Sequence, residues 1–502
     1  MVDLTDHQRR RRVLFLNANE TARPYRVAPI GLAFVATATE RAGHDVRLVD
    51  LPQTRAGHRQ FVRALRDWRP DFLALGIRNL DNSDYHALET YLAGPARLIR
   101  EARQLAPRAT MIVGGPAGTI DPERMAAVTK CDHLVLGEGE ESLPQLIARL
   151  SAGQRVPRIF GADPDGTPFR VANPAALPAP ALYRWVNHFA PYLRGDAGYP
   201  VQTKRGCPLR CTYCTYGRIE GERYRFLNPT AIAAEIEGAL ARGIRDIEFV
   251  DSTFNLPVRH ALEVLRTLRA RGLQANYIGT GLNPRQLPDE LLETMHAIGF
   301  RSVILTAESA SDTMLANYQK NYRRDRLLAA AESLQRHGIR ALWIFLLGGP
   351  GETRETVEQT LSFIAQYVPS PNSVYITSGV RIYPGSRMND EWDRGRLDGE
   401  HLRRRFVNVD VPFYYSRQTP PEWLEARLRE FQHLQPQVML SCEGHAWLTQ
   451  AALWVMQYLP VNKPYWHYIP TLNTARRWMR WPAMKPSRPA ETLSQLSPVP
   501  QS

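Results

Sequence analysis

The sequence predicts an α/β fold made of a doubly wound parallel sheet followed by a partial barrel. Two observations predict it: short, nearly continuous apolar runs recur along the chain, and amphipathic helix-like stretches separate them. Such runs are typical of strands buried on both faces, and their alternation with helices indicates βαβ units. The length of 502 residues also suits about three domains.

The first unit covers residues 13–150 and follows a basic tail at 1–12 that we expect to be disordered. Its expected strands lie at 13–17, 45–50, 71–77, 109–115 and 133–137. Five strands in this length suit a flavodoxin-like sheet, whose ligands bind beyond the carboxyl ends of the strands. Loops at those ends contain Asn79, Asn82, Gly114, Gly115 and Pro116. The glycines would let a flat ligand approach the backbone, although asparagines there are equally typical of turns.

A proline-rich stretch at 151–200 predicts a linker. Six strand-like runs then follow, at 201–205, 246–250, 275–279, 302–306, 341–347 and 373–382. They fit a partial α/β barrel over 201–395, with its chemistry at the carboxyl ends of the strands. We expect a helical, aromatic-rich region at 396–482 and a disordered tail at 483–502.

The composition narrows the possible functions. The net charge is +13, but most basic residues are arginines scattered along helix-like runs, which indicates a solvated surface rather than a nucleic-acid partner. No apolar run reaches the ~18–20 residues of a spanning helix, and the N-terminus lacks a signal-peptide core. A cytoplasmic location is therefore expected. Five cysteines are too few for a disulfide framework in a chain of this length.

Three of the cysteines, Cys207, Cys211 and Cys214, form a C-x3-C-x2-C array directly after the first barrel strand. Thiolates this close in sequence can converge on one metal centre. A structural zinc site usually closes with four ligands, whereas a four-iron cluster held by three thiolates leaves one iron open. Cys131 and Cys442 stand apart, and a catalytic role for Cys442 is left open.

This loop resembles the signature of the radical S-adenosylmethionine (SAM) superfamily, including the aromatic Tyr213 before the third cysteine. The resemblance implies a [4Fe–4S] cluster whose open iron binds SAM. It also implies that one electron from the cluster cleaves SAM to methionine and a 5′-deoxyadenosyl radical. A flavodoxin or ferredoxin would supply that electron.

Polar residues and glycines stand where the barrel strands are expected to end. They are Asp251 and Thr253 after the second strand, Glu308 and Ser309 after the fourth, and Gly348, Gly349 and Gly351 after the fifth. The superfamily uses these strand ends to hold SAM, so the resemblance implies the same role here. Each also has a structural alternative, since Glu308 could cap the next helix and the glycine loop could be only a turn.

A flavodoxin-like domain before such a barrel resembles the cobalamin-binding radical SAM class over roughly 13–395. The motifs that carry the resemblance are GGPA, LGEGE, AESASD and VRIYPGS. It implies cobalamin at the carboxyl edge of the first sheet and methylation of an unactivated centre in a biosynthetic small molecule. The D-x-H-x-x-G motif of many cobalamin domains is missing after the first strand. The nearest string, Asp84-Tyr85-His86, follows the third strand, so no axial ligand is identified.

Other functions compete with methyl transfer. A cobalamin-dependent radical cyclase or rearrangement enzyme stays open. A tRNA methylthiotransferase would carry more cluster cysteines in the first domain, which has only Cys131. An iron–sulfur sensor or nucleic-acid-binding protein would need a DNA-binding element, and no such signature occurs.

The C-terminal aromatic segment also has two interpretations. It contains Trp447, Trp454, Trp466, Trp478 and Trp481. The segment either packs over the barrel as a helical cap or rests on a membrane surface, which would suit a lipid-like substrate.

Overall fold

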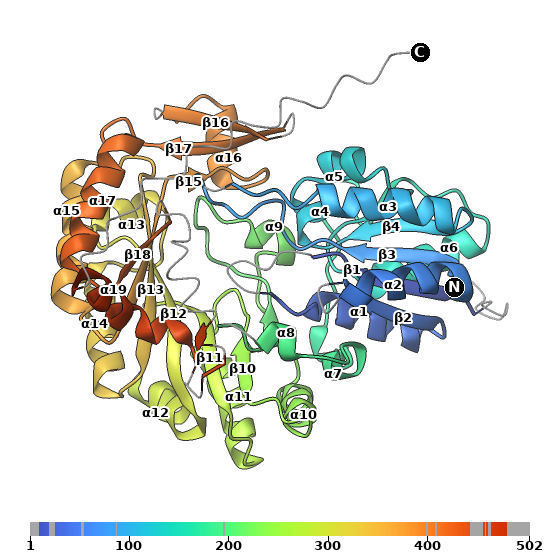
Figure 1. The fold of residues 1–502 in the computed structure, drawn as a ribbon, viewed down its shortest axis with the longest axis horizontal. Helices are drawn as coiled ribbons and strands as arrows, with labels where there is room; N and C mark the ends of the chain where they lie inside the picture. The colour runs from blue at the N-terminus through green and yellow to red at the C-terminus, as the bar shows by residue number, and fades with distance from the viewer. Residues whose placement is uncertain are drawn as a thin grey trace.

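Two parallel sheets lie side by side in the computed structural model, with a short helix of the cysteine region between them (Figure 1). The structure describes residues 10–19, 26–51, 55–86, 88–193, 196–397, 400–406, 409–441, 455–456, 458–459 and 463–478. Both tails expected to be disordered lie wholly or mostly outside these ranges, as do Cys442, Trp447, Trp454 and Trp481.

The N-terminal sheet has the strand order β2-β1-β3-β4-β5-β6. Its strands are β1 (Arg12–Asn17), β2 (Asp45–Asp50), β3 (Phe72–Gly76), β4 (Thr110–Gly114), β5 (His133–Val135) and β6 (Ile159–Phe160). The helices around it are α1 (Ile30–Arg41), α2 (Arg55–Arg63), α3 (Ala93–Leu105), α4 (Pro116–Ile120), α5 (Pro122–Thr129) and α6 (Gly139–Ser151). The first five strands have the expected flavodoxin-like order. The sixth, β6, comes from the segment expected to be a linker.

The second sheet is the partial barrel, with the strand order β18-β14-β13-β12-β11-β10-β7. Its strands are β7 (Tyr199–Val201), β10 (Asp246–Phe249), β11 (Asn276–Leu282), β12 (Phe300–Glu308), β13 (Arg340–Leu347), β14 (Ser373–Ser378) and β18 (Val438–Leu440). All neighbouring pairs are parallel. The helices outside it are α10 (Pro229–Leu240), α11 (Val258–Ala270), α12 (Asp289–Ile298), α14 (Arg324–Arg336), α15 (Arg354–Tyr367) and α17 (Pro421–Leu434). Six strands match the expected runs, and β18 adds a seventh.

The remaining part of the linker segment forms short elements, η3 (Pro174–Ala176), α7 (Leu182–Trp185) and α8 (Ala190–Leu193). They are not a free tether, because Tyr192 in α8 donates a 2.7 Å hydrogen bond from its hydroxyl to Asp50 at the end of β2. Asn17 at the end of β1 also donates to Asp50. Burial outweighs these bonds and raises the pKa of Asp50.

The region beyond residue 395 contains strands as well as the expected helices. Strands β16 (Glu400–Phe406) and β17 (Val409–Tyr415) form a three-stranded antiparallel sheet with β15 (Val380–Arg381). The sequence carries the signal, since apolar residues recur at every second position from Val409 to Tyr415, the period of a strand. The short helix α16 (Arg387–Asp393) lies beside this sheet (Figure 1).

The C-terminal segment with η5 (Tyr465–Tyr468) and α19 (Ile469–Trp478) contacts the second strand from each edge of the partial barrel. On one side, Lys463 lies 3.2 Å from Asp246 of β10. On the other, Ser373 of β14 donates to the carbonyl of Trp466 at 2.8 Å. Trp466 is buried, so this part packs as a cap, at the base of the barrel rather than at its mouth. Among the described residues, no helix is long and apolar enough to cross a membrane.

Candidate functional site

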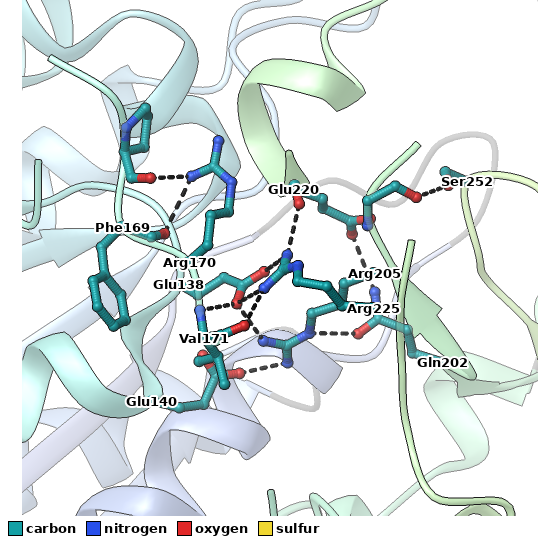
Figure 2. Close-up of polar contacts among 12 residues, drawn as sticks. Glu138, Glu140, Phe169, Arg170, Val171, Gln202, Arg205, Glu220, Arg225 and Ser252 are labelled. Atoms are coloured by element: carbon teal, nitrogen blue, oxygen red, sulfur yellow. Dashed lines mark hydrogen bonds and ion pairs between the residues drawn. The ribbon is translucent and has the colours of Figure 1, made fainter. Parts of the chain in front are cut away.

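The two domains are joined by a buried group of ions next to the cysteine loop (Figure 2). Glu138 accepts two hydrogen bonds from Arg225, at 2.5 and 2.9 Å. Arg205, two residues before Cys207, lies 2.5 Å from Glu140 and 3.3 Å from Glu138. Although burial opposes its ionisation, the pairing with the arginines lowers the pKa of Glu138. The LGEGE motif of the first domain therefore fixes the strand that leads into the cysteine loop.

A second contact joins the loop after β3 to the end of the barrel. Arg381 of β15 donates two hydrogen bonds to Asp81, at 3.0 and 3.2 Å, and both side chains are buried. The hydroxyl of Tyr383 donates to the same carboxylate at 2.9 Å. His86 of the same loop lies 3.2 Å from Glu425 of α17. Its imidazole therefore faces the barrel side of the interface.

The three cysteines lie on one loop between β8 (Lys204–Arg205) and α9 (Tyr216–Glu220). Cys207 is buried, and its amide donates to Gly221 at 2.9 Å. Cys211 and Cys214 are half-buried. The loop is held from the barrel side, because the amide of Thr212 donates to the carbonyl of Tyr318. All three thiols are free of disulfides.

The three thiols of this loop are the donor type that holds an iron–sulfur cluster. Among the described residues, no three Cys, His, Asp or Glu side chains converge closely enough to hold one metal ion. A four-iron cluster is wider than one ion and needs thiolates spread around it. Burial and the two neighbouring thiols raise the pKa of Cys214 to about 12, so a cationic metal centre is what would favour the thiolate form.

A buried polar group lies against the cysteine loop, made of Tyr213, Glu308 and Lys320. Tyr213 donates a 2.6 Å hydrogen bond to Oε1 of Glu308, and the Lys320 ammonium lies 3.5 Å from the same oxygen. Oε2 of Glu308 has no hydrogen-bond partner among the described residues. Glu308 also has φ +61°, a left-handed conformation that is costly for a residue with a side chain and is typical of functional sites. Lys320 was not expected from the sequence, because no motif marks it.

Two of the expected SAM-binding residues, Asp251 and Ser309, form hydrogen bonds within the protein. Asp251 accepts hydrogen bonds from the amide and hydroxyl of Thr203, at 2.8 and 2.7 Å, and from the amide of Lys204. Ser309 is fully buried, and its hydroxyl pairs with Thr360 at 3.1 Å. Both side chains hydrogen-bond within the protein in this structure, so a contact of Asp251 or Ser309 with SAM stays a prediction.

The glycine loop after β13 is shaped by protein neighbours. A Cβ on Gly349 would lie 2.1 Å from the Tyr318 hydroxyl, and one on Gly351 would lie 2.4 Å from Asn317. Gly348 has φ +91° and donates its amide to the buried Glu352. The packing of α13 (Asp312–Asn317) and its C-terminal cap is therefore enough to require Gly349 and Gly351, and the contact of this loop with SAM stays a prediction. Among the other expected residues, Thr253 pairs with Tyr224 at 2.8 Å.

The carboxyl edge of the N-terminal sheet is only partly covered. Asn79 is exposed after β3, and Gly114 and Pro116 are half-exposed after β4. Gly115 has φ +101°, and a Cβ there would lie 2.6 Å from the carbonyl of Ile77, so its own turn requires glycine. Asn82 stabilises the turn of its own loop, because its Oδ1 accepts hydrogen bonds from two amides of that loop.

A three-cysteine loop at the mouth of a partial barrel, clamped to the carboxyl edge of a flavodoxin-like sheet, defines an enzyme class with two cofactor domains. Comparison with known families agrees. The B12 binding domain family matches residues 20–147, and the Radical SAM superfamily matches residues 201–364. The chain therefore carries a B12-binding domain followed by a radical SAM domain, and it is an enzyme whose cofactors are a [4Fe–4S] cluster, SAM and cobalamin.

Relatives extend this result over most of the chain. The uncharacterized methyltransferase PH0819 of Pyrococcus horikoshii is 25% identical over 447 residues, which cover 85% of this chain and 92% of that protein. The tryptophan 2-C-methyltransferase of Streptomyces laurentii is 25% identical and covers 81% and 80% of the two chains. The radical SAM methyltransferase TsrM of Kitasatospora setae, solved with cobalamin and a [4Fe–4S] cluster, has the same fold, with a TM-score of 0.80 at 21% identity over 94% of this chain and 99% of that one.

Proposed function

We propose that this chain methylates an unactivated centre of a biosynthetic small molecule. One observation carries the proposal: Arg205, next to the cysteine loop, is paired with Glu138 and Glu140 of the B12-binding domain. This clamp sets the cluster loop against the sheet edge where cobalamin binds in such domains. The similarity to the tryptophan 2-C-methyltransferase of Streptomyces laurentii supports methyl transfer.

The residues present fit the three groups. Cys207, Cys211 and Cys214 would hold the cluster, and the free Oε2 of Glu308 would accept a hydrogen bond from SAM. Asn79 and the Gly114–Pro116 turn would contact the corrin periphery, whose amides need hydrogen-bonding partners. When bound, the cluster supplies an electron, SAM a methyl group and a radical precursor, and cobalamin a methyl carrier.

The protein's own part is to orient these groups and exclude water. Tyr213 and Lys320 hold the Glu308 carboxylate through Oε1, so that its other oxygen keeps a fixed direction. Burial opposes the charge of Lys320, but Tyr322, Glu308 and the neighbouring thiols outweigh it and raise the pKa of Lys320. This lysine therefore stays protonated as a donor. The ion pairs at both domain contacts keep the interface closed around the site.

The test is a cofactor count followed by a single-turnover assay. The chain, reconstituted anaerobically with iron, sulfide and hydroxocobalamin, should retain about four irons and one cobalt. With SAM and a reductant but no acceptor, it should form about one S-adenosylhomocysteine per cobalt. Cobalt retention without S-adenosylhomocysteine would contradict methyl transfer and favour a cobalamin-dependent cyclase or rearrangement enzyme.

The physiological setting is part of the same proposal. We propose a cytoplasmic enzyme reduced by a flavodoxin or ferredoxin. A contact with a membrane surface is the alternative role for the C-terminal segment, and the exposed side chains of Val455, Tyr458 and Leu459 support it. Flotation with anionic phospholipid vesicles tests that contact, because an unbound chain stays in the lower fraction.

A further inference from the structure

The two faces of the barrel strands are buried to different extents. In β13 the outward residues Ala341, Trp343, Phe345 and Leu347 are buried, while Leu342, Ile344 and Leu346 between them are only half-buried. The neighbouring strands β12 and β14 alternate in the same way over their central residues. The outward residues pack against the helices in the main core. The inward residues face the lumen and keep part of their surface accessible.

The inward face of β13 is apolar and partly accessible over most of its length. The half-buried residues of β13 run from Leu342 to Leu346, which is roughly 13 Å along a strand. The hydroxyls of Thr306 and Thr377 also face inward, but each donates to a backbone carbonyl of a neighbouring strand. The walls therefore offer an apolar surface, typical of a ligand pocket with few polar groups.

Glu248 of β10 is an ionisable side chain that faces the lumen below the mouth. Glu248 lies between Ile247 and Phe249, which belong to the outward core, so it points inward. It is more than nine-tenths buried. Its Oε2 accepts the amide of Gly198 at 3.0 Å. Its Oε1 has no hydrogen-bond partner among the described residues.

The groups around Glu248 leave a net negative charge. Asp196 adds a second carboxylate, whose oxygens accept the amides of Tyr465 and Trp466. Lys463 forms an ion pair with Asp246 and donates a hydrogen bond to the carbonyl of Leu193. The other cation that acts on Glu248 is Arg78, from the loop after β3. Three carboxylates thus face two cations.

We propose that the lumen is the substrate cavity and that Glu248 binds a primary ammonium group at its base. The substrate is then an apolar molecule that ends in an amine, with the opposite end presented at the mouth beside the cysteine loop. This inference rests on the proposed function, because it names the substrate class of the same site. Burial raises the pKa of Glu248 to about 7, so an ammonium must displace its proton at neutral pH, and amine affinity should rise with pH up to about 8.

The test uses matched probe pairs on the reconstituted chain, with S-adenosylhomocysteine in place of SAM. The pairs are tryptamine with 3-ethylindole and octylamine with 1-octanol. Calorimetry at pH 8 should show at least one amine binding tenfold or more tightly than its neutral partner. Glu248→Gln keeps the shape and should reduce that preference below about threefold and remove its pH dependence, whereas Glu248→Asp should restore part of it.

Glu263→Gln is the control, since it makes the same change on the exposed face of α11. It should leave the preference unchanged. Equal binding within both pairs, no binding of either amine, or an unchanged preference in Glu248→Gln would overturn the inference. Iron and cobalt contents, measured on the same preparations, report whether Glu248→Gln still folds around its cofactors, and S-adenosylhomocysteine formation without an acceptor is measured on the unmodified chain and on Glu263→Gln. Their absence from the unmodified chain would instead contradict the proposed function.

Discussion

The outer and inner faces of the same barrel strands differ in what their side chains do. On the outer face Trp343 and Phe345 are almost fully buried against the helices. On the inner face Ile344 lies between them in sequence but is half-exposed in the lumen. A strand gives both faces the same backbone, so the difference lies in what covers them. The outer face stabilises the fold, and the inner face stays partly accessible.

The largest effect is expected at the mouth of the lumen, where the cysteine loop lies. Cys211→Ala should abolish the visible absorbance of the cluster and retain no more than background iron, because the loop then offers only two of the thiolates that would hold it. Circular dichroism should be unchanged, since Cys211 is half-exposed. Cys131→Ala is the control, because that thiol is buried in the N-terminal core. A full cluster in Cys211→Ala would contradict the ligand assignment.

The next largest effect, a loss of stability, is expected on the outer face of the barrel strands. Phe345→Ala removes a fully buried ring, and the lost burial plus the cavity should lower the free energy of unfolding by about 3–5 kcal/mol. Denaturant titration of the apo chain measures it. A loss below about 1 kcal/mol would mean that the outer face is not the main core.

The third prediction concerns pH and the base of the lumen. The pKa of Glu248 is raised from about 4.5 to about 7, so the folded chain binds this proton more tightly than the unfolded chain does. Its stabilisation is complete below pH 4.5 and is lost as pH rises through 7, by up to about 3 kcal/mol. Glu248→Gln should flatten this part of the stability profile. Asp196, with a pKa raised to about 6, should keep a smaller slope of the same sign, and an unchanged profile would place Glu248 in contact with water.

The smallest effect on stability is expected on the inner face. Ile344→Ala should cost only about 1 kcal/mol, because the half-exposed side chain leaves no closed cavity. The same change should weaken the binding of octylamine in the reconstituted chain. A loss as large as that of Phe345→Ala would show that the lumen is packed rather than open.

The sequence alone determined the elements whose signals are local. Apolar runs gave five strands of the first sheet and six of the barrel, and the spacing of Cys207, Cys211 and Cys214 gave the metal-binding loop, because ligands on one short loop need no distant partner. Strands β16 and β17 also had a local signal, the alternation from Val409 to Tyr415, that the expectation of a helical region overlooked.

The tertiary structure alone decided which polar side chains are free. Asp251, Ser309 and Glu308 all stand at strand ends in the sequence, yet only Glu308 keeps an oxygen without a partner. Likewise, nothing in the local sequence distinguishes Glu248 from another glutamate in a strand. Hydrogen-bond partners and burial depend on residues that lie far apart in the chain, such as Thr203 for Asp251 and Gly198 for Glu248. No local pattern encodes such pairings, because they arise only when strands and domains pack together.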